Sequence, residues 1–219
     1  MNSLTSYINT EIKPLKHSNS ILEAQLLFEE FPYSHFPVTE DAIYIGCIAK
    51  ETAEFSNSEA LINDSRFQFE RFFVRSSMIW LDVLEVFAKN DSNILPVLDE
   101  KNNYIGYYEL EDVIRFLHET PFLKEEGGIL IIEKEINNFS MSQVAQIIES
   151  NNAKILGLFI SNVVNNKVEI TIKISQSGLN DIIQTFRRYE YEIVSEHQED
   201  SYLNGLKERS DYLDKYLNI

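Results

Sequence analysis

Hydrophobic positions along this chain follow a pattern that occurs twice, at a nearly constant offset. In each copy, apolar residues at helical spacing precede a short apolar stretch with a proline, and a second apolar stretch ends in glycine. The offset pairs Leu22 with Leu81, Phe28 with Phe87 and Pro37 with Pro96, and after one extra residue Gly46 with Gly106. The pattern predicts a duplicated unit of helix, strand, turn, strand and helix.

The first repeat has a helix-start signal at Ser20 and Glu23. In such a capping box the serine hydroxyl accepts a hydrogen bond from a first-turn amide, and the glutamate reaches back to the cap amide. We therefore expect a helix over 21–31. Its inward stripe is predicted to be Leu22, Leu26 and Leu27. In the second repeat Ile79 replaces the serine, so that helix depends on packing.

Two short strands follow the helix in each repeat. The first strands are 36–38 and 95–97, and their partners are 43–48 and 104–108. Polar loops at 39–41 and 99–103 suit hairpins. Because proline cannot donate to a central ladder, Pro37 and Pro96 are expected at a strand start or a sheet edge.

The segments around the repeats are less regular. Residues 1–19 predict a short helix and a strand, and 54–71 predict a helical connector into a strand at 72–75. A helix over 110–119 closes the second repeat. The polar, glycine-containing segment 124–128 is the best domain boundary.

The third region has its own order of elements. Strands are predicted at 128–133, 153–160, 167–174 and 191–194, with helices from Ser140 to Ser150 and over 179–189. In 167–174 apolar and polar residues alternate perfectly, which indicates a sheet with one covered face. The order βαββαβ predicts a ferredoxin-like sandwich, so the fold class is α+β.

The predicted organisation is a first repeat at 1–53, a connector at 54–71, a second repeat at 72–124, a third region at 125–198 and a closing helix at 199–219. Two domains suit a chain of 219 residues.

Charge narrows the classes of partner. The formal net charge of −16 opposes binding to nucleic acid or to anionic lipid. The single cysteine, Cys47, excludes an intrachain disulfide and is expected in the core. No apolar run approaches the ~20 residues of a membrane helix, so we expect a cytoplasmic protein without a membrane partner.

The repeated helix, apolar-x-Pro-Val strand and apolar-Gly strand resemble the CBS domain, whose two copies pack about a pseudo-twofold axis. The third region resembles the ACT domain in its order of elements. Together they resemble bacterial regulatory proteins of the acetoin-utilization type. The resemblance implies a non-catalytic sensor or regulatory module, assembled as a homodimer, with a small-molecule ligand or an unidentified protein as its partner.

The resemblance also implies an adenine-nucleotide site, in which the motif Gly-x-x-Ser/Thr-x-x-Asp places a hydroxyl at phosphate and an acid at ribose. The first repeat has Ala49 and Thr52 at these positions, and the second has Glu109 and Asp112. The implied ligand-binding residues are Asp112, Glu109, Ile94, Pro96, Val74, Thr52 and Phe36.

The residues favour some ligands over others. A phosphate beside Glu109 would be repelled by about 4 kcal/mol at ~4 Å and an effective dielectric of ~20. AMP and ATP therefore fit less well than neutral adenosine, a cationic ligand such as S-adenosylmethionine, or no ligand. If no ligand binds, Asp112 is interpreted equally well as a helix N-cap, and Glu109 is interpreted as a solvated acid in the first helical turn.

No catalytic or metal-binding constellation is present in the sequence. His17, His35, His118 and His197 lie far apart, with no metal-ligand spacing. The loop 137–140, where ACT domains commonly bind amino acids, has no glycine, which favours a sheet that serves for dimerisation. Two hypotheses remain: a sensor that binds an adenosine-containing metabolite, and a ligand-free interaction scaffold.

Overall fold

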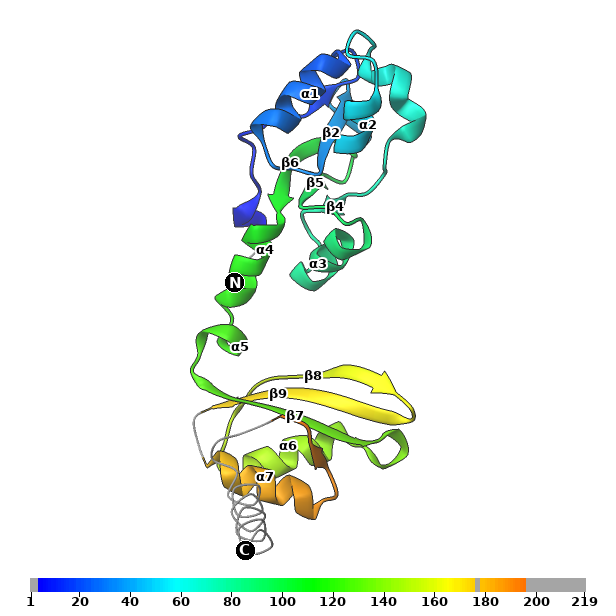
Figure 1. Cartoon of the computed structure of the whole chain (residues 1–219). Coiled ribbons are helices and arrows are strands. Elements are labelled where there is room, and N and C mark those ends of the chain that lie inside the picture. The colour runs from blue at the N-terminus through cyan, green and yellow to red at the C-terminus, as the bar shows by residue number, and fades with distance from the viewer. Residues whose placement is uncertain (1–3, 176–177, 196–219) are drawn as a thin grey trace, which may run out of the picture. The chain divides into compact units, whose positions relative to one another are not determined.

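The computed structural model describes residues 4–175 and 178–195 and separates the chain into two compact units, Met1–Leu117 and His118–Ile219 (Figure 1). In the first unit the elements in order are η1 (Leu4–Tyr7), β1 (Leu15–Lys16), α1 (Ile21–Glu30), β2 (His35–Glu40), β3 (Ile43–Ala49), α2 (Lys50–Phe55), η2 (Ile62–Gln68), β4 (Val74–Arg75), α3 (Trp80–Lys89), β5 (Ile94–Leu98), β6 (Tyr104–Glu109) and α4 (Leu110–His118). Helix, strand, strand and helix thus occur twice, as predicted.

The two repeats form sheets of identical topology, ordered β1-β2-β3 and β4-β5-β6. In each sheet the first pair is parallel and the second antiparallel. Val38 pairs with Gly46 and Val97 with Gly106, and each register shifts immediately after the valine. The predicted duplication is therefore confirmed at the level of strand register.

The prolines lie in the middle strands of their sheets, not in edge strands. This is possible because β1 pairs only with Val38 and Thr39, and β4 only with Val97 and Leu98. Pro37 and Pro96 lie just before these pairs, where the neighbouring short strand requires no amide donor from them. The prediction of a strand start or a sheet edge was wrong, since each proline is the third residue of a middle strand, although each is unpaired on one side.

Helix α1 begins as predicted but buries a different face. The Ser20 hydroxyl accepts a hydrogen bond from the Glu23 amide, and the Glu23 carboxylate accepts one from the Ser20 amide. These two bonds confirm the capping box. Leu22 and Leu26 are 49% and 54% exposed, so the predicted stripe was wrong for both, whereas Leu27 is partly buried against the core. The buried residues are Ile21, Ala24 and Phe28. Helix α3 has no side-chain cap at Ile79, as expected.

Each repeat has its own hydrophobic core, built from equivalent positions. One cluster contains Leu15, Ala24, Phe28, Phe36, Val38, Ile48 and Ala53. The other contains Val74, Val83, Phe87, Leu95, Val97, Tyr108 and Val113. The two sets are written in corresponding order, so the first residue of one is the counterpart of the first residue of the other, and so on. Both repeats therefore bury the same faces of the same elements.

Reciprocal backbone hydrogen bonds join the repeats. The Tyr44 amide donates to the Asn102 carbonyl (3.2 Å), and the Tyr104 amide donates to the Ala42 carbonyl (3.2 Å). Each bond becomes the other when both of its residues are exchanged for their counterparts in the opposite repeat. Ile43 and Asn103, which are also counterparts, form a bridge with each other. These contacts place a pseudo-twofold axis between the two hairpins.

The connector between the repeats is less helical than predicted. It contains the end of α2 and the 3-10 helix η2, and the strand predicted at 72–75 is reduced to β4. The Cys47 and Glu70 amides and carbonyls exchange two bonds (2.7 and 3.0 Å), as those of Tyr107 and Asn9 do (2.9 and 2.8 Å). The segment before the second repeat therefore runs alongside β3, and the segment before the first repeat runs alongside β6, the counterpart of β3.

In the second unit the elements are α5 (Pro121–Lys124), β7 (Gly127–Glu135), η3 (Ile136–Asn138), α6 (Met141–Ser150), β8 (Ile155–Val164), β9 (Lys167–Ser175), α7 (Leu179–Arg188) and β10 (Glu192–Ile193). The antiparallel sheet has the order β10-β7-β9-β8. Helices α6 and α7 cover one face of it (Figure 1). The ferredoxin-like topology is confirmed.

The alternation in β9 has the predicted consequence: Val168, Ile170, Ile172 and Ile174 are buried beneath the helices. Ser140 caps α6 by accepting from the Gln143 amide. The structure groups α5 with this unit, where Phe122 packs against Phe159; the predicted boundary lay after residue 124. The closing helix predicted over 199–219 lies outside the described residues. No helix in the described part of the chain could span a bilayer.

Gly46 and Gly106, which occupy corresponding positions in the two repeats, provide a test of the repeat geometry. Both have φ of 147°, and a Cβ on Gly106 would lie 2.6 Å from the Asn9 carbonyl oxygen. We expect Gly106→Ala to lower the free energy of unfolding by about 2 kcal/mol or more, and Gly46→Ala to act in the same direction. Urea unfolding followed by fluorescence of Trp80, the single tryptophan, measures both.

Ala42→Gly is a control substitution that should raise the free energy of unfolding instead of lowering it. The φ of 69° at Ala42 strains an alanine and suits glycine, so Ala42→Gly is expected to stabilise by about 0.5 kcal/mol. A loss below about 0.5 kcal/mol for Gly106→Ala would contradict the close approach of the N-terminal segment to β6.

Candidate functional site

A pocket of about 510 Å³ lies between the two repeats, at the start of α2. We call it the Thr52 cleft, after the motif that it adjoins. It is lined by Ser34, His35, Ala49, Lys50, Glu51, Glu54, Glu70, Asn90 and Asp91. Residues 34–54 come from the first repeat, and Asn90 and Asp91 follow α3 of the second. A pocket of this size suits a small ligand.

His35 forms a buried, hydrogen-bonded wall of the Thr52 cleft. Its ring is 8% exposed, with Nδ1 2.8 Å from Ser34 Oγ and Nε2 3.3 Å from Glu70 Oε1. Phe72 packs against the ring at 5.1 Å between centroids. The imidazole is therefore fixed on both nitrogens, and one edge of the pocket is rigid.

The lining of the Thr52 cleft is strongly acidic. Four carboxylates face one ammonium, that of Lys50, which lies 3.9 Å from Glu54. Carboxylates accept hydrogen bonds from hydroxyl and amino groups and repel phosphate. The pocket thus suits a neutral or cationic ligand rich in donors.

The corresponding region of the second repeat, around Glu109 and Asp112, we call the Asp112 cleft, and there Glu109 accepts two hydrogen bonds from residues of the first repeat. The Tyr33 hydroxyl donates to Glu109 Oε1 at 2.8 Å, and Asn9 Nδ2 donates to the same oxygen at 3.2 Å. Burial, followed by the hydrogen bond to Glu109, raises the pKa of Tyr33, so the hydroxyl remains a donor. The equivalent of Tyr33 in the second repeat is Ser92.

Two ligand-free expectations for this motif were wrong. Glu109 is not a solvated first-turn acid; it ends β6 and is partly buried and hydrogen-bonded. Asp112 is not an N-cap, because α4 begins at Leu110 and Asp112 lies in its first turn. Its carboxylate lies 3.2 Å from the Arg115 guanidinium. Burial raises the pKa of Asp112, and repulsion from Glu109 raises it further.

The remaining predicted site residues divide into buried and accessible ones. Phe36, Val74 and Ile94 are at most 1% exposed, and Pro96 is also buried, so their side chains pack in the cores. Thr52 lies in the first turn of α2 and is partly exposed. Cys47 is fully buried, and burial raises the pKa of its thiol to about 12, as suits the expected core residue.

The sequence interpretation missed Tyr33, Asn9 and the pair His35–Glu70. Tyr33 and Glu109 are 76 positions apart, and no local spacing relates them. The repeat itself held a usable signal: at corresponding positions Tyr33 stands opposite Ser92, and Lys50 opposite Leu110. Differences between twins mark where the two clefts diverge.

Comparisons with known proteins bear on the second repeat and on the first unit. Residues 70–119 match the family model of the CBS domain. The chain is similar to a CBS domain pair/ACT domain protein from Thermotoga maritima, at 18% identity, a TM-score of 0.49 and coverage of 53% of this chain and 97% of that chain. It is also similar to CBS domains of a transcriptional regulator from Streptococcus pneumoniae, at 18% identity, a TM-score of 0.47 and coverage of 52% and 97%.

A third solved structure, CBSX2 in complex with AMP, matches at 17% identity, a TM-score of 0.43 and coverage of 52% and 95%. A comparison with curated proteins gave no match. The second repeat is a CBS domain, and with its twin it gives the first unit the fold of a CBS domain pair. CBS domains are regulatory modules, and no catalytic family is indicated for this chain.

The coupling between Glu109 and Asp112 can be tested by titration. Replacing Glu109 by glutamine removes the repulsive charge, so the pKa of Asp112 should fall while remaining raised by burial. Because the folded state holds this proton more tightly than the unfolded chain, stability from Asp112 grows as the pH falls through the raised pKa and is absent at neutral pH.

The pKa of Asp112 is measured by carbon-13 NMR of its carboxyl carbon in the wild type and in Glu109→Gln. Glu111→Gln is the control on an exposed acid of the same helix, and should shift the pKa in the same direction but less, because Glu111 contributes less than Glu109. An Asp112 pKa at or below 3.8 in the wild type would contradict the described environment.

Proposed function

We propose that the first unit is a non-catalytic regulatory module that binds an adenosine-containing ligand without net negative charge in the Thr52 cleft. The observation that carries the proposal is the pocket of about 510 Å³ between the repeats, with Glu51, Glu70 and Asp91 in its lining. Carboxylates match the ribose hydroxyls and the adenine amino group as acceptors. The negative charge of the same carboxylates attracts a positively charged sulfonium such as that of S-adenosylmethionine.

The position of the pocket supports a regulatory role. Its residues come from both repeats, so a ligand contacts both and its affinity depends on how they are packed. A ligand that binds one packing more tightly shifts the population toward it. The Thr52 cleft therefore provides a means of converting ligand concentration into a change within the CBS domain pair.

The Asp112 cleft is a second candidate, favoured by one observation. Asp112 is partly buried beside Glu109, which raises its pKa, and the structure describes one side-chain donor to it, Arg115 at 3.2 Å. Ribose hydroxyls would supply the missing donors, which is how perturbed acids mark functional sites. A ligand there requires Tyr33 to leave Glu109.

The alternative is a ligand-free dimeric scaffold. Exposed apolar residues on the helices of the first unit support it: Leu22 and Leu26 on α1, Leu81 on α3 and Ile114 on α4 are 49–57% exposed. Exposed apolar patches mark interaction surfaces. We also propose that the second unit is ACT-like and serves assembly; its strand order supports this, and the loop around η3 has no glycine.

Thermal unfolding with a ligand series tests the sensor. S-adenosylmethionine and adenosine should raise the melting temperature of the first unit, followed by Trp80 fluorescence, and AMP and ATP should raise it less or not at all. A ligand at 100 times its Kd adds about 2.7 kcal/mol, a shift of several degrees.

Matched variants locate the site. Glu51→Gln should reduce the shift with S-adenosylmethionine, whereas Glu111→Gln, the equivalent change in the Asp112 cleft, should leave it unchanged. Loss of the shift in Asp112→Asn alone would instead assign binding to the second candidate. No shift with any of the four compounds would favour the scaffold.

Light scattering tests the dimer. The wild-type chain is expected at twice the mass of one chain, and Leu22→Glu with Leu26→Glu should give a monomer, because a charge in an apolar interface is left unpaired. Phe67→Ser is the control on an exposed residue outside these helices. A wild-type monomer at micromolar concentration would rule out a stable homodimer.

A further inference from the structure

A separate pocket of about 400 Å³ lies beside the hairpin turns of the CBS domain pair. It is lined by Ile43, Tyr44, Ile45, Arg66, Arg71, Phe73, Leu98 and Asn102, and we call it the arginine pocket. None of these residues lines the Thr52 cleft. Its chemistry is also opposite, since two guanidinium groups replace the acidic lining.

The polar groups that the arginine pocket offers are donors. Arg66 is held by Glu40, with Nη2 3.1 Å from Oε2. Asn102 Oδ1 accepts from Arg75 Nη2 at 2.8 Å, which leaves the Asn102 amide NH₂ as a donor. Arg71 forms no hydrogen bond or ion pair with any residue that the structure describes, so its guanidinium is uncompensated.

The one hydroxyl in the lining is already committed. Tyr44 donates to the Phe72 carbonyl at 2.7 Å, and its oxygen lies 3.3 Å from Cys47 Sγ. The acceptors around the pocket are thus used within the protein, while Arg71 and Asn102 keep free donors. Groups that can only donate recognise carboxylates and phosphates.

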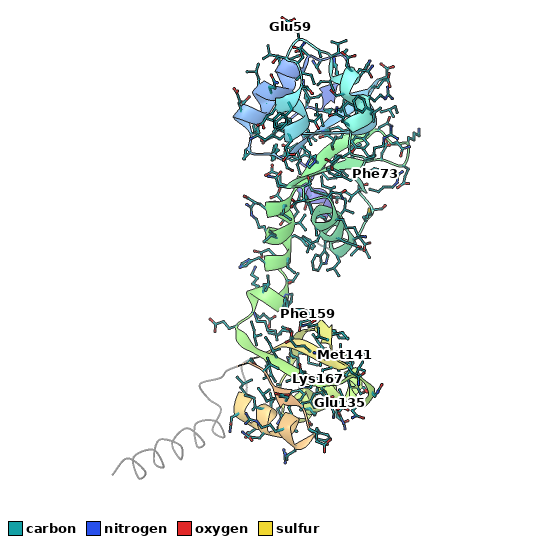
Figure 2. The ribbon with its side chains drawn as sticks, turned by 45° about the vertical axis from the view of Figure 1, so that its right-hand side comes forward. Glu59, Phe73, Glu135, Met141, Phe159 and Lys167 are labelled. Carbon is teal, nitrogen blue, oxygen red and sulfur yellow. The ribbon has the colours of Figure 1, made fainter. Side chains whose placement is uncertain are left out.

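The walls of the arginine pocket are apolar and partly open. Ile43 is 41% exposed and Phe73 is 38% exposed, and Phe73 lies at the surface of the first unit (Figure 2). The Arg75 guanidinium lies 5.6 Å from the centre of the Phe73 ring and orients it. An apolar body that covers these side chains would remove them from water.

We propose that the arginine pocket binds a small organic anion, a carboxylate carried on an aromatic or branched apolar group. The carboxylate pairs with Arg71 and the Asn102 amide, and the apolar group lies against Phe73 and Ile43. The volume of about 400 Å³ accommodates a compound of this size.

The site lies at the contact between the two hairpins. The Tyr44 amide donates to the Asn102 carbonyl, so the pocket adjoins one of the two backbone bonds that join the repeats. An anion bound there contacts both hairpins and stabilises their present arrangement. The proposal does not require a ligand in the Thr52 cleft, because the two pockets share no lining residue.

The test uses the full chain labelled with nitrogen-15 and phenylacetate as the probe. Saturable amide shifts are expected around Ile43, Phe73 and Asn102. Phenylacetamide, which keeps the ring and lacks the charge, should bind about tenfold more weakly, equivalent to about 1.4 kcal/mol. Inorganic phosphate alone should give no saturable shifts at these positions.

Arg71→Gln should weaken phenylacetate binding about tenfold and leave the melting temperature unchanged, because Arg71 has no partner to lose. Arg115→Gln is the control on an exposed arginine outside the pocket; it loses an ion pair with Asp112 but should leave the Kd for phenylacetate unchanged. No saturable binding of phenylacetate, equal binding of the amide, or an unchanged Kd in Arg71→Gln would each overturn the proposal. Phosphate binding as tight as that of phenylacetate would overturn the role of the apolar walls.

Discussion

The structure of the first unit depends on hydrogen bonds that the two repeats exchange across their pseudo-twofold axis. At one end, the Ser34 amide donates to Asn93 Oδ1 (2.8 Å), and the Asn93 amide donates to Ser34 Oγ (3.2 Å). At the hairpins, Tyr44 and Tyr104 donate to carbonyls of the opposite repeat. The second core also takes in Cys47 of the first repeat, and these bonds and that apolar contact together fix how the repeats face each other. The clefts between the repeats depend on this fixed packing of one repeat against the other.

One scaffold has produced two unlike clefts. Equivalent backbone bonds position both: the Lys50 amide donates to Ser34 (2.9 Å) and the Leu110 amide to Asn93 (3.1 Å). The side chains then diverge, since Tyr33 bonds to Glu109 at the Asp112 cleft and its equivalent Ser92 donates to the Ile94 carbonyl. The acids that line the Thr52 cleft favour a ligand without negative charge. The arginine pocket, beside the hairpins, has the opposite charge.

The sequence predicted what short-range patterns determine. The capping box at Ser20, the twin glycines and the alternation in β9 each act through neighbours along the chain, and all were confirmed. Leu22 and Leu26 were wrongly placed in the buried stripe of α1, because Leu22 and Ile21 are equally apolar and only the position of the sheet decides which is buried. The bond from Tyr33 to Glu109 joins residues 76 positions apart, so no local pattern predicts it, and only the difference between Tyr33 and its counterpart Ser92 marks the position.

A double-mutant cycle at Ser34 and Asn93 tests the central claim most directly. Ser34→Ala, Asn93→Ala and the double variant are unfolded in urea with Trp80 fluorescence as the signal. Each single variant loses one of the two reciprocal bonds and should lower the free energy of unfolding by about 0.5–1.5 kcal/mol. The bond from Ser34 Oγ to Asn93 Oδ1 (3.1 Å) joins the two side chains and predicts a coupling energy of about 0.5–1 kcal/mol. Losses below about 0.3 kcal/mol in both single variants, with a coupling energy within about 0.3 kcal/mol of zero, would show that the repeats are not held together by this exchange, and would contradict the account of both clefts.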